Sequence, residues 1–391
     1  MPRDMIFTSE SVTPGHPDKL CDQISDAAID AFLRHDPAAH AVVECAVATG
    51  VVFLAARFAA EAVIDLPSLA RKVIANVGYV EGGFDARSCS ILTSLVELPK
   101  SMRQPACVKP DEEAIAACSA LDQANVFGYA CRETQELMPL PISLAHRIAR
   151  ALDRARPHLP WLSPDAKTQV SIEYRDRRPL RIHTVTVTAA VAAGTPSGQV
   201  EEGLRAAVAK TFDDADMRPD GRTAINVNAG EPYEIGGPAR HAGLTGRKNG
   251  IDTYGEIARQ SGAALSGKDP SRIDRIGAYA ARHAAKNVVA AGFAERCEVH
   301  LAYAIGRAEP LSLSVTSFGT GAIPDQDIAA RVENAVDFRP AAIMRRFGLR
   351  TQPGLRGEQG FYRPLAVYGH FGRPDLDLPW EATDLVDALR G

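Results

Sequence analysis

Alternating apolar and polar positions mark three pairs of neighbouring β-strands along the chain. Each run has period two and is rich in β-branched residues, which is typical of strands joined as hairpins. The predicted pairs are residues 40–50 with 51–58, 168–174 with 180–189, and 296–305 with 311–318. Their first residues, His40, Thr168 and Arg296, are each 128 residues apart, which indicates an internal repeat.

Apolar residues at helical spacing predict an amphipathic helix after each strand pair, over residues 66–77, 198–212 and 325–338. Further helices are predicted over residues 18–35, 142–156 and 273–290. The pattern favours an α+β protein built from three similar strand-strand-helix units, each with one sheet face covered by helices. Chance recurrence of a hairpin and a helix in an ordinary α+β chain is the alternative.

The length and the net charge of the chain exclude some classes of function. A chain of 391 residues is longer than one typical domain, and 46% hydrophobic residues are enough to form a core. The net charge of −4 gives no general field for nucleic acid or an anionic membrane, so any anion site must be local. Only nine of the 44 basic residues are lysines, which makes the position of each lysine informative.

The cysteines and the apolar segments indicate in which cellular compartment the protein is expected. Seven scattered cysteines without a C-x-x-C pair are expected to be free thiols. The most apolar segment, residues 45–56, has 12 residues, short of the roughly 20 that a membrane-spanning helix needs. No signal peptide is recognisable at the N-terminus, so we expect a cytoplasmic protein that binds neither membranes nor nucleic acid.

Four polar segments interrupt the periodic pattern, at residues 8–19, 163–169, 235–254 and 261–275. Each contains a lysine, and these are Lys19, Lys167, Lys248 and Lys268. Turns with exposed backbone N–H groups beside cations suit a polyphosphate. Lys268 is followed by Asp269 rather than Ser or Thr, so a phosphate-loop nucleoside triphosphatase fits poorly.

Two of these segments carry acidic residues of uncertain role. His16 and Asp18 immediately precede a predicted helix, whose N-terminus favours phosphate; a simple N-cap role for Asp18 is the alternative. Asp165 and Lys167 are expected on a turn before the second strand pair.

Six long motifs indicate that the chain is related to a known protein family. The chain contains FTSESVTPGHPDKLCDQISDA, GYACRETQELMPLPISLAHR, LPWLSPDAKTQV, IGGPARHAGLTGRKNGIDTYG, SGKDPSRIDRIGAYAARHAAKNVVAAG and VYGHFGRPDLDLPWEATD. In order and spacing these motifs resemble those of the S-adenosylmethionine synthetase (methionine adenosyltransferase) family. The resemblance implies three similar domains around a pseudo-threefold axis, here residues 1–105, 115–235 and 236–391, with segments exchanged between them.

The resemblance also implies a reaction and an assembly. The sulfur of methionine attacks C5′ of ATP, and the displaced triphosphate is cleaved to pyrophosphate and phosphate. The protein is expected to form a homodimer or a dimer of dimers, with active sites between subunits. A pair of Mg²⁺ ions and K⁺ are the implied cofactors.

By the same resemblance, His16 lies near the bond that breaks, and the residues that hold phosphate oxygens are Lys167, Arg247, Lys248 and Lys268. The implied Mg²⁺ ligands are Asp18 and Asp274, and the implied K⁺ ligand is Glu44. The residues at nucleotide-contact positions are Asp122, Asp165, Tyr233 and Ala264.

This sequence departs from the family around the methionine pocket. Glutamate, glutamine, aspartate and lysine positions of that pocket fall on Arg57, Leu98, His241 and Arg272. Leu98 depends on the alignment of a loop, and Arg57 depends on the strand register. Because an α-ammonium group needs carboxylates around it, replacing them disfavours methionine in its usual pose.

Several readings therefore stay open. A divergent methionine enzyme with compensating residues is one, and the same chemistry on a nucleophile that lacks the α-ammonium group is another. An ATP-binding pseudoenzyme that pairs with a true synthetase is a third, and a tripolyphosphatase or ATPase is a fourth. Retention of the phosphate residues His16, Lys167, Lys248 and Lys268 argues against the pseudoenzyme.

Overall fold

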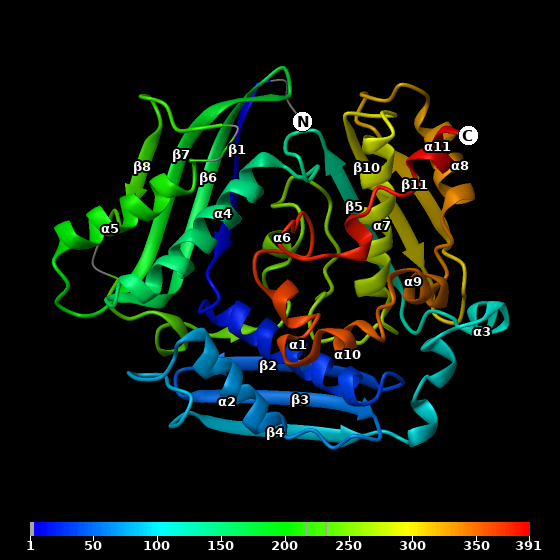
Figure 1. Ribbon diagram of the computed structural model, residues 1–391, viewed down its shortest axis with the longest axis horizontal. Helices are drawn as coiled ribbons and strands as arrows, with labels where there is room; N and C mark the ends of the chain where they lie inside the picture. Colours follow the sequence, from blue (N-terminus) through cyan, green and yellow to red (C-terminus); the bar gives the residue numbers. More distant parts are fainter. Residues whose placement is uncertain (1–3, 214, 216, 231–232) are drawn as a thin grey trace.

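A computed structural model describes residues 4–213, 215, 217–230 and 233–391. In this part of the chain, three β-sheets surround a centre filled by helices (Figure 1). The N-terminal sheet contains, in order, β4 (Ser90–Glu97), β3 (Val51–Ala59), β2 (His40–Ala48) and β9 (Gly243–Leu244). The central sheet contains β1 (Met5–Val12), β6 (Leu162–Arg175), β7 (Arg178–Val191) and β8 (Ala224–Val227). The C-terminal sheet contains β11 (Ser312–Thr316), β10 (Arg296–Tyr303) and β5 (Ala124–Cys131).

The three predicted strand pairs are confirmed as antiparallel neighbours, β2 with β3, β6 with β7, and β10 with β11. One expectation is wrong: Asp165 and Lys167 lie inside β6, not on a turn before it. The pairing of β6 with β7 shifts register between Leu162 and Ala166. This irregularity lets a polar, proline-containing stretch remain in a strand, because a bulge tolerates unpaired backbone groups.

Each repeat sends its first strand into the sheet of the next repeat. β1 pairs with β6, β5 pairs with β10, and β9 pairs with β2. The repeated unit is therefore strand, helix, strand, strand, helix, which is larger than the predicted strand-strand-helix unit. The same exchange in all three repeats argues against chance recurrence and gives the α+β fold its threefold arrangement.

The predicted long helices are present with small shifts at their ends. α1 (Pro17–His35), α4 (Leu140–Ala155) and α7 (Ile273–Ala290) lie on the sides of the sheets that face the centre (Figure 1). α2 (Leu66–Val77), α5 (Ser197–Lys210) and α8 (Asp325–Ala335) follow the strand pairs. α8 ends before Phe338 because the chain becomes extended at Val336. The shorter helices are α3 (Glu112–Ala117), α6 (Asn249–Asp252), α9 (Pro340–Phe347), α10 (Gln352–Arg356) and α11 (Val386–Arg390).

Close packing of α7 on β5 depends on one glycine. A Cβ atom on Gly128 of β5 would lie 1.9 Å from the carbonyl carbon of Ala281 in α7, so a larger residue would push the helix away. Of the helices that the structure describes, none combines the length and the apolar character that crossing a bilayer requires.

Buried ion pairs tie the helices together at the centre. The carboxylate of Asp26 on α1 accepts two hydrogen bonds, at 2.7 and 2.9 Å, from the guanidinium of Arg275 on α7, and both side chains are fully buried. Lys19 is also fully buried and pairs with Asp22 and Asp252. Lys19 therefore stabilises the fold, and its place among the candidate phosphate lysines is wrong.

Replacing Asp26 by Asn is expected to destabilise the protein by about 3 kcal/mol or more, because Arg275 would keep its charge in a buried place without a counterion. We expect the apparent melting temperature, measured by differential scanning fluorimetry, to fall by several degrees. Glu358→Gln removes one partner of the exposed Lys72–Glu358 pair and is the control, with almost no expected change. Equal shifts for both variants would contradict this account.

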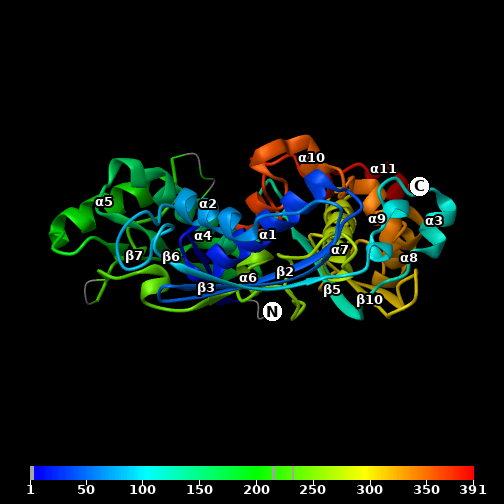
Figure 2. The same ribbon diagram turned by 90° about the horizontal axis from the view of Figure 1, so that it is seen from below.

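One face of the N-terminal sheet is left without helices. α1 and α2 lie on one side of this sheet only, as the view from below shows (Figure 2). The opposite face exposes a row of apolar side chains, Val51, Phe53, Leu92, Val96 and Leu244, which are 39% to 55% exposed. A contiguous apolar face of this kind is typical of a protein–protein contact.

Candidate active site

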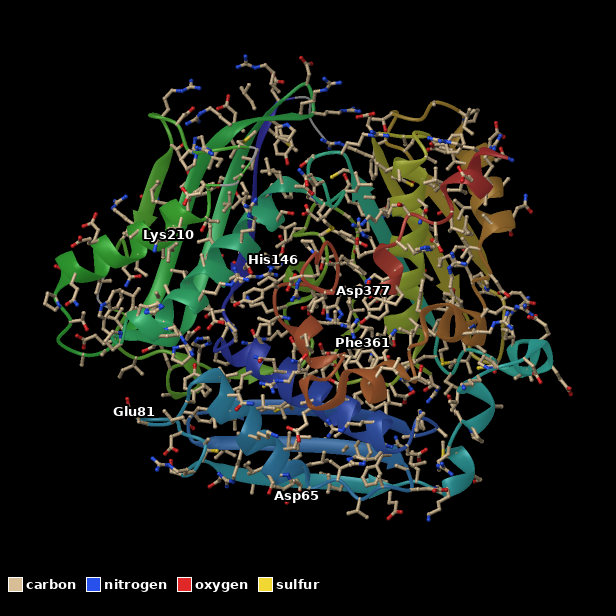
Figure 3. The ribbon with its side chains drawn as sticks, viewed as in Figure 1. Asp65, Glu81, His146, Lys210, Phe361 and Asp377 are labelled. Carbon is tan, nitrogen blue, oxygen red and sulfur yellow. The ribbon has the colours of Figure 1, made fainter. Side chains whose placement is uncertain are left out.

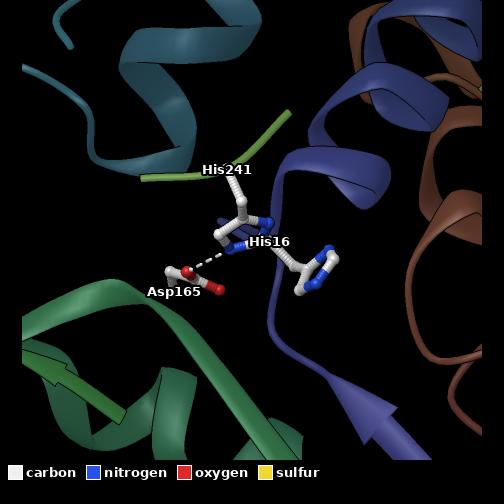
Figure 4. A group of neighbouring side chains, drawn as sticks. All are labelled: His16, Asp165 and His241. Carbon is white, nitrogen blue, oxygen red and sulfur yellow. Dashed lines mark hydrogen bonds and ion pairs between the residues drawn. The ribbon is translucent and has the colours of Figure 1, made fainter. Parts of the chain in front are cut away.

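Two imidazoles and a carboxylate meet where β6, the start of α1 and the segment before β9 come together (Figure 4). Nε2 of His241 lies 3.2 Å from Oδ2 of Asp165. The rings of His16 and His241 contact edge to face, with their centroids 5.0 Å apart. The structure thus brings together three residues that are distant in the sequence.

Asp165 is fully buried, and its Oδ2 accepts all the hydrogen bonds that its side chain receives from described residues. The hydroxyl of Tyr233 donates to Oδ2 at 2.9 Å, and the backbone N–H of Gly237 donates at 2.7 Å. Burial alone would raise the pKa of Asp165, but the hydrogen bonds from His241 and Gly237 outweigh it and lower the pKa below its usual value. Asp165 is therefore ionised at neutral pH.

His16 begins α1, where its Nδ1 accepts a hydrogen bond from the backbone N–H of Asp18 at 3.3 Å. His16, not Asp18, is therefore the N-cap, and the alternative role considered for Asp18 is wrong. Burial lowers the pKa of His16 to about 3; the Asp165 carboxylate opposes this shift, and Lys248, His241 and Lys167 add to it. The imidazole is neutral at physiological pH, and both lysines are close enough to act on it.

Asp18 lies in the first turn of α1 and is buried. Its Oδ1 accepts the backbone N–H of Leu244 at 3.0 Å and lies 2.9 Å from Nε of Arg247. Lys248 pairs with Glu10 at 3.2 Å, while Lys167 is exposed and has no ion pair within the described residues. Ala264 lies against Gly246, one residue before Arg247.

These residues form what we call the histidine-side group, which consists of His16, Asp18, Asp165, Lys167, Tyr233, His241, Arg247, Lys248 and Ala264. Glycines allow the close approaches in it. Gly237, with a positive φ of 65°, places its N–H on Asp165, and a Cβ atom there would lie 2.0 Å from the hydroxyl oxygen of Tyr79.

A second set of predicted residues lies elsewhere in the same chain. Nζ of Lys268 contacts Oδ2 of Asp274 at 2.9 Å, and Nη2 of Arg272 contacts Oδ2 of Asp122 at 2.5 Å. Backbone hydrogen bonds hold the Lys268 segment on β2, because Val43 N–H donates to Gly267 and Asp269 N–H donates to Ala41.

Two of the positions that depart from the family, Arg57 and Leu98, lie at the end of the N-terminal sheet where Lys268 pairs with β2. Arg57 lies opposite Val42, which also pairs with Lys268. The backbone N–H of Leu98 donates to Phe58 at 2.7 Å, beside Arg57. Glu44 and Arg57 are both exposed on the face without helices. We call this set the lysine-268 group, and it consists of Glu44, Arg57, Leu98, Asp122, Lys268, Arg272 and Asp274.

The two groups lie at different ends of the N-terminal sheet. β9, which follows His241, pairs with Ala46 and Val47 of β2, whereas Lys268 pairs with Val42. Four residues of a strand span about 13 Å. The two groups are therefore separated along β2 within the described part of one chain.

Comparison with known protein families shows to which family the chain belongs. Family models of the N-terminal, central and C-terminal domains of S-adenosylmethionine synthetase match residues 4–99, 117–233 and 235–382. The chain belongs to the S-adenosylmethionine synthetase family. As a member of that family it is a transferase of the methionine adenosyltransferase type.

Curated relatives cover the whole chain. The S-adenosylmethionine synthase of Acaryochloris marina (strain MBIC 11017) is 46% identical over 409 residues, which cover 100% of this chain and 97% of the relative. That of Synechococcus sp. (strain JA-3-3Ab) is 46% identical over 403 residues, which cover 98% of this chain and 97% of the relative.

Sequence reasoning missed supporting residues of the S-adenosylmethionine synthetase site. Glu10 was not singled out, although it pairs with Lys248 and lies in the same TSES motif as the start of the site. Asp269 was noted only as excluding a phosphate loop, yet it accepts the N–H groups of Ala41 and Ser271 and so anchors the Lys268 segment. The signal for Asp269 was its place in the SGKDP motif.

Proposed function

We propose that the protein catalyses attack of a sulfur nucleophile, methionine or a related thioether, on C5′ of ATP. The products are an S-adenosyl sulfonium and triphosphate, which is then cleaved to pyrophosphate and phosphate. The observation that carries this proposal is the histidine-side group, in which a neutral, buried His16 lies among Lys167, Lys248 and Arg247. Family membership supports the same chemistry.

The chemistry asks for alignment and charge stabilisation rather than proton transfer, because a thioether sulfur has no proton to lose. Lys167 suits a leaving polyphosphate, since it is exposed and unpaired within the described residues. Lys248 and Arg247 are held in place by Glu10 and Asp18. His16 would donate from Nε2, because its Nδ1 already accepts a backbone N–H.

We assign nucleotide contacts to Asp165, Tyr233 and Ala264 in the histidine-side group and to Asp122 in the lysine-268 group. Asp165 supports this, because its buried Oδ1 has no hydrogen-bond partner among the described residues and can accept a hydrogen bond from a ligand. Asp122 is about one-third exposed and is oriented by Arg272.

The acidic residues fit the implied cations. Asp18 and Asp274 would hold Mg²⁺, which would neutralise charge on the triphosphate. In each carboxylate one oxygen has a protein donor, and no hydrogen bond within the described residues involves the other. Mg²⁺ usually takes one or two carboxylates together with phosphates and waters, and these free oxygens suit it. Glu44 offers an exposed carboxylate for K⁺.

A complete site would need two copies of the chain. The histidine-side and lysine-268 groups lie at different ends of the N-terminal sheet, whose outer face exposes several apolar side chains. Two such faces packed about a twofold axis would place one group of each copy beside the other group of its partner. We therefore propose a homodimer, or a dimer of dimers, with active sites between subunits.

The nucleophile is the open part of this proposal. Arg57 places an exposed cation in the lysine-268 group, and no ion pair within the described residues neutralises it. His241 has Asp165 as its partner. A nucleophile that carries a carboxylate without an α-ammonium group would suit Arg57 better than methionine does.

The test is to incubate the purified protein with ATP, Mg²⁺ and K⁺, with and without methionine, and with thioethers that lack the amino group. Adenosyl products are measured by mass spectrometry and phosphate by colorimetry. We expect an adenosyl sulfonium together with pyrophosphate and phosphate in equal amounts.

Each outcome has a distinct meaning. Robust S-adenosylmethionine formation would reject the changed-nucleophile reading. Release of phosphate without any adenosyl product would favour a tripolyphosphatase or ATPase, and ATP binding without turnover under any thioether would favour the pseudoenzyme.

A further inference from the structure

All seven cysteines are free thiols, as expected, and two of them lie in contact in the connection between β4 and β5. Cys107 ends the 3₁₀ helix η2 (Pro105–Cys107), and Cys118 follows α3, at the outer edge of the molecule (Figure 1). Their Sγ atoms are 3.4 Å apart and hydrogen bonded. The adenosyl transfer proposed above uses neither thiol, so the pair is a candidate for separate chemistry.

Cys107 is the more acidic thiol of the pair. The hydrogen bond with Cys118 lowers the pKa of Cys107 to about 7; burial and the Asp269 carboxylate oppose this shift, and the Arg350 guanidinium adds to it. The same hydrogen bond and burial raise the pKa of Cys118. At neutral pH much of Cys107 is therefore thiolate, the nucleophilic form of cysteine, while Cys118 keeps its proton.

A fixed cation lies near Cys107. Arg350 is buried, and its Nη1 donates to the carbonyl oxygens of Pro37 and Ala39 at 3.1 and 2.9 Å. Its Nη2 donates to Oδ1 of Asp269 at 3.3 Å, and its buried Nε has no hydrogen-bond partner among the described residues. Because the guanidinium is held in place, it stays near Cys107 and favours the thiolate.

Three of the other thiols contrast with this pair. Burial raises the pKa of Cys21, Cys131 and Cys297, so these thiols stay protonated. Buried, protonated thiols of this kind are inert. Cys118, by contrast, is only half-buried, which leaves the pair open to a small oxidant.

The geometry lets the two sulfurs bond after small movements. A disulfide bond is about 2.05 Å long, so the sulfurs have to approach by about 1.3 Å from their present contact. Cys107 is the last residue of η2, and Cys118 is the C-cap of α3, so neither is held inside a long helix or a strand. The bond would join the segment that follows Leu98 to the segment that precedes Asp122.

We propose that Cys107 and Cys118 form a modification site, at which a peroxide converts the two thiols reversibly to a disulfide. The Cys107 thiolate attacks one peroxide oxygen, the O–O bond breaks, and the other oxygen leaves as hydroxide and takes up a proton to become water. The sulfur of Cys118 then attacks the sulfenic acid on Cys107 and loses its proton, while the S–O bond breaks and a second water leaves. Two electrons pass from the sulfurs to the peroxide.

The test treats the reduced, full-length protein with hydrogen peroxide and then alkylates the remaining thiols. Proteolysis after acidic residues, which include Glu112 and Asp122, places Cys107, Cys118 and Cys131 in separate peptides for mass spectrometry. We expect the loss of two of the seven free thiols per chain and linked Cys107 and Cys118 peptides, both reversed by dithiothreitol. A non-reducing gel verifies that the link lies within one chain. This readout needs no ATP or nucleophile, so its result is independent of the adenosyltransfer assay.

Three variants separate the roles of the thiols. Cys118→Ala removes the second thiol, so dimedone should trap Cys107 as a sulfenic acid, and the pH midpoint of this reaction should rise from about 7 toward the ordinary thiol value of about 8.5. Cys107→Ser should give neither the disulfide nor the dimedone adduct. Cys89→Ser changes a buried cysteine outside the pair and should keep the link, and melting curves verify that each variant is folded. Absence of the linked peptides in the wild type, equal thiol loss in Cys107→Ser, or an unchanged pH midpoint in Cys118→Ala would overturn the proposal.

Discussion

Lys167→Met and Lys268→Met are each expected to lower kcat for adenosyl transfer by about 100- to 1,000-fold, the usual loss when one charge-stabilising donor is removed. Lys167 belongs to the histidine-side group and Lys268 to the lysine-268 group. Both variants should still form dimers, because neither residue is among the exposed apolar side chains of the N-terminal sheet. The measurement is initial-rate kinetics with whichever nucleophile supports turnover.

Mixing the two inactive variants should restore activity. If each active site combines the histidine-side group of one copy with the lysine-268 group of its partner, a mixed dimer has one intact site and one doubly altered site. Random subunit exchange would make half of the dimers mixed, so the mixture should recover about a quarter of the wild-type activity. An active site contained within one chain would give no recovery.

Lys210→Met is the matched control for this experiment. Lys210 is an exposed lysine at the end of α5, a helix that packs beside α4 in the central domain, and it belongs to neither group (Figure 3). It should keep wild-type activity alone and in mixtures. Full activity of Lys167→Met alone would contradict the proposed role of the histidine-side group.

The local alternation of apolar and polar residues was enough to predict much of the fold. Strand pairs such as β2 with β3 are close in the sequence, and their period-two alternation identifies them without knowledge of distant contacts. The family resemblance implied that segments exchange between the domains, but the local pattern could not identify β1, β5 and β9 as those segments, because the exchange depends on pairing between strands that lie far apart in the chain. Asp165 and Lys167 were misplaced on a turn because Ser163 and Pro164, near the start of the bulged strand β6, are residues typical of a loop.

The candidate site was predicted as a set of residues but not as two groups. The motifs supply the residue types, whereas the distribution over both ends of the N-terminal sheet depends on which segment pairs with which part of β2. Lys19 shows that the position of a charged residue in the sequence does not by itself distinguish a binding residue from one in a structural ion pair. Its partner Asp252 is 233 residues away, so its burial in a structural ion pair was invisible in the sequence.

Arg57→Glu combined with His241→Asp is expected to improve use of methionine by about 10-fold or more in kcat/KM, because each change restores an acceptor for the α-ammonium group. Arg57 and His241 belong to different groups, so in the proposed dimer they face one nucleophile from two subunits. The measurement compares methionine with the same thioether lacking its amino group, for the wild type, both single variants and the double variant.

The decisive quantity is the ratio of kcat/KM for methionine to that for the amine-free analogue. A carboxylate at position 57 should repel the substrate carboxylate and attract the ammonium, so the ratio should rise even if the overall rate falls. Arg87→Glu makes the same charge change at an exposed arginine outside both groups and should leave the ratio unchanged. If the double variant also leaves the ratio unchanged, Arg57 and His241 do not contact the nucleophile, and methionine would have to bind through other residues.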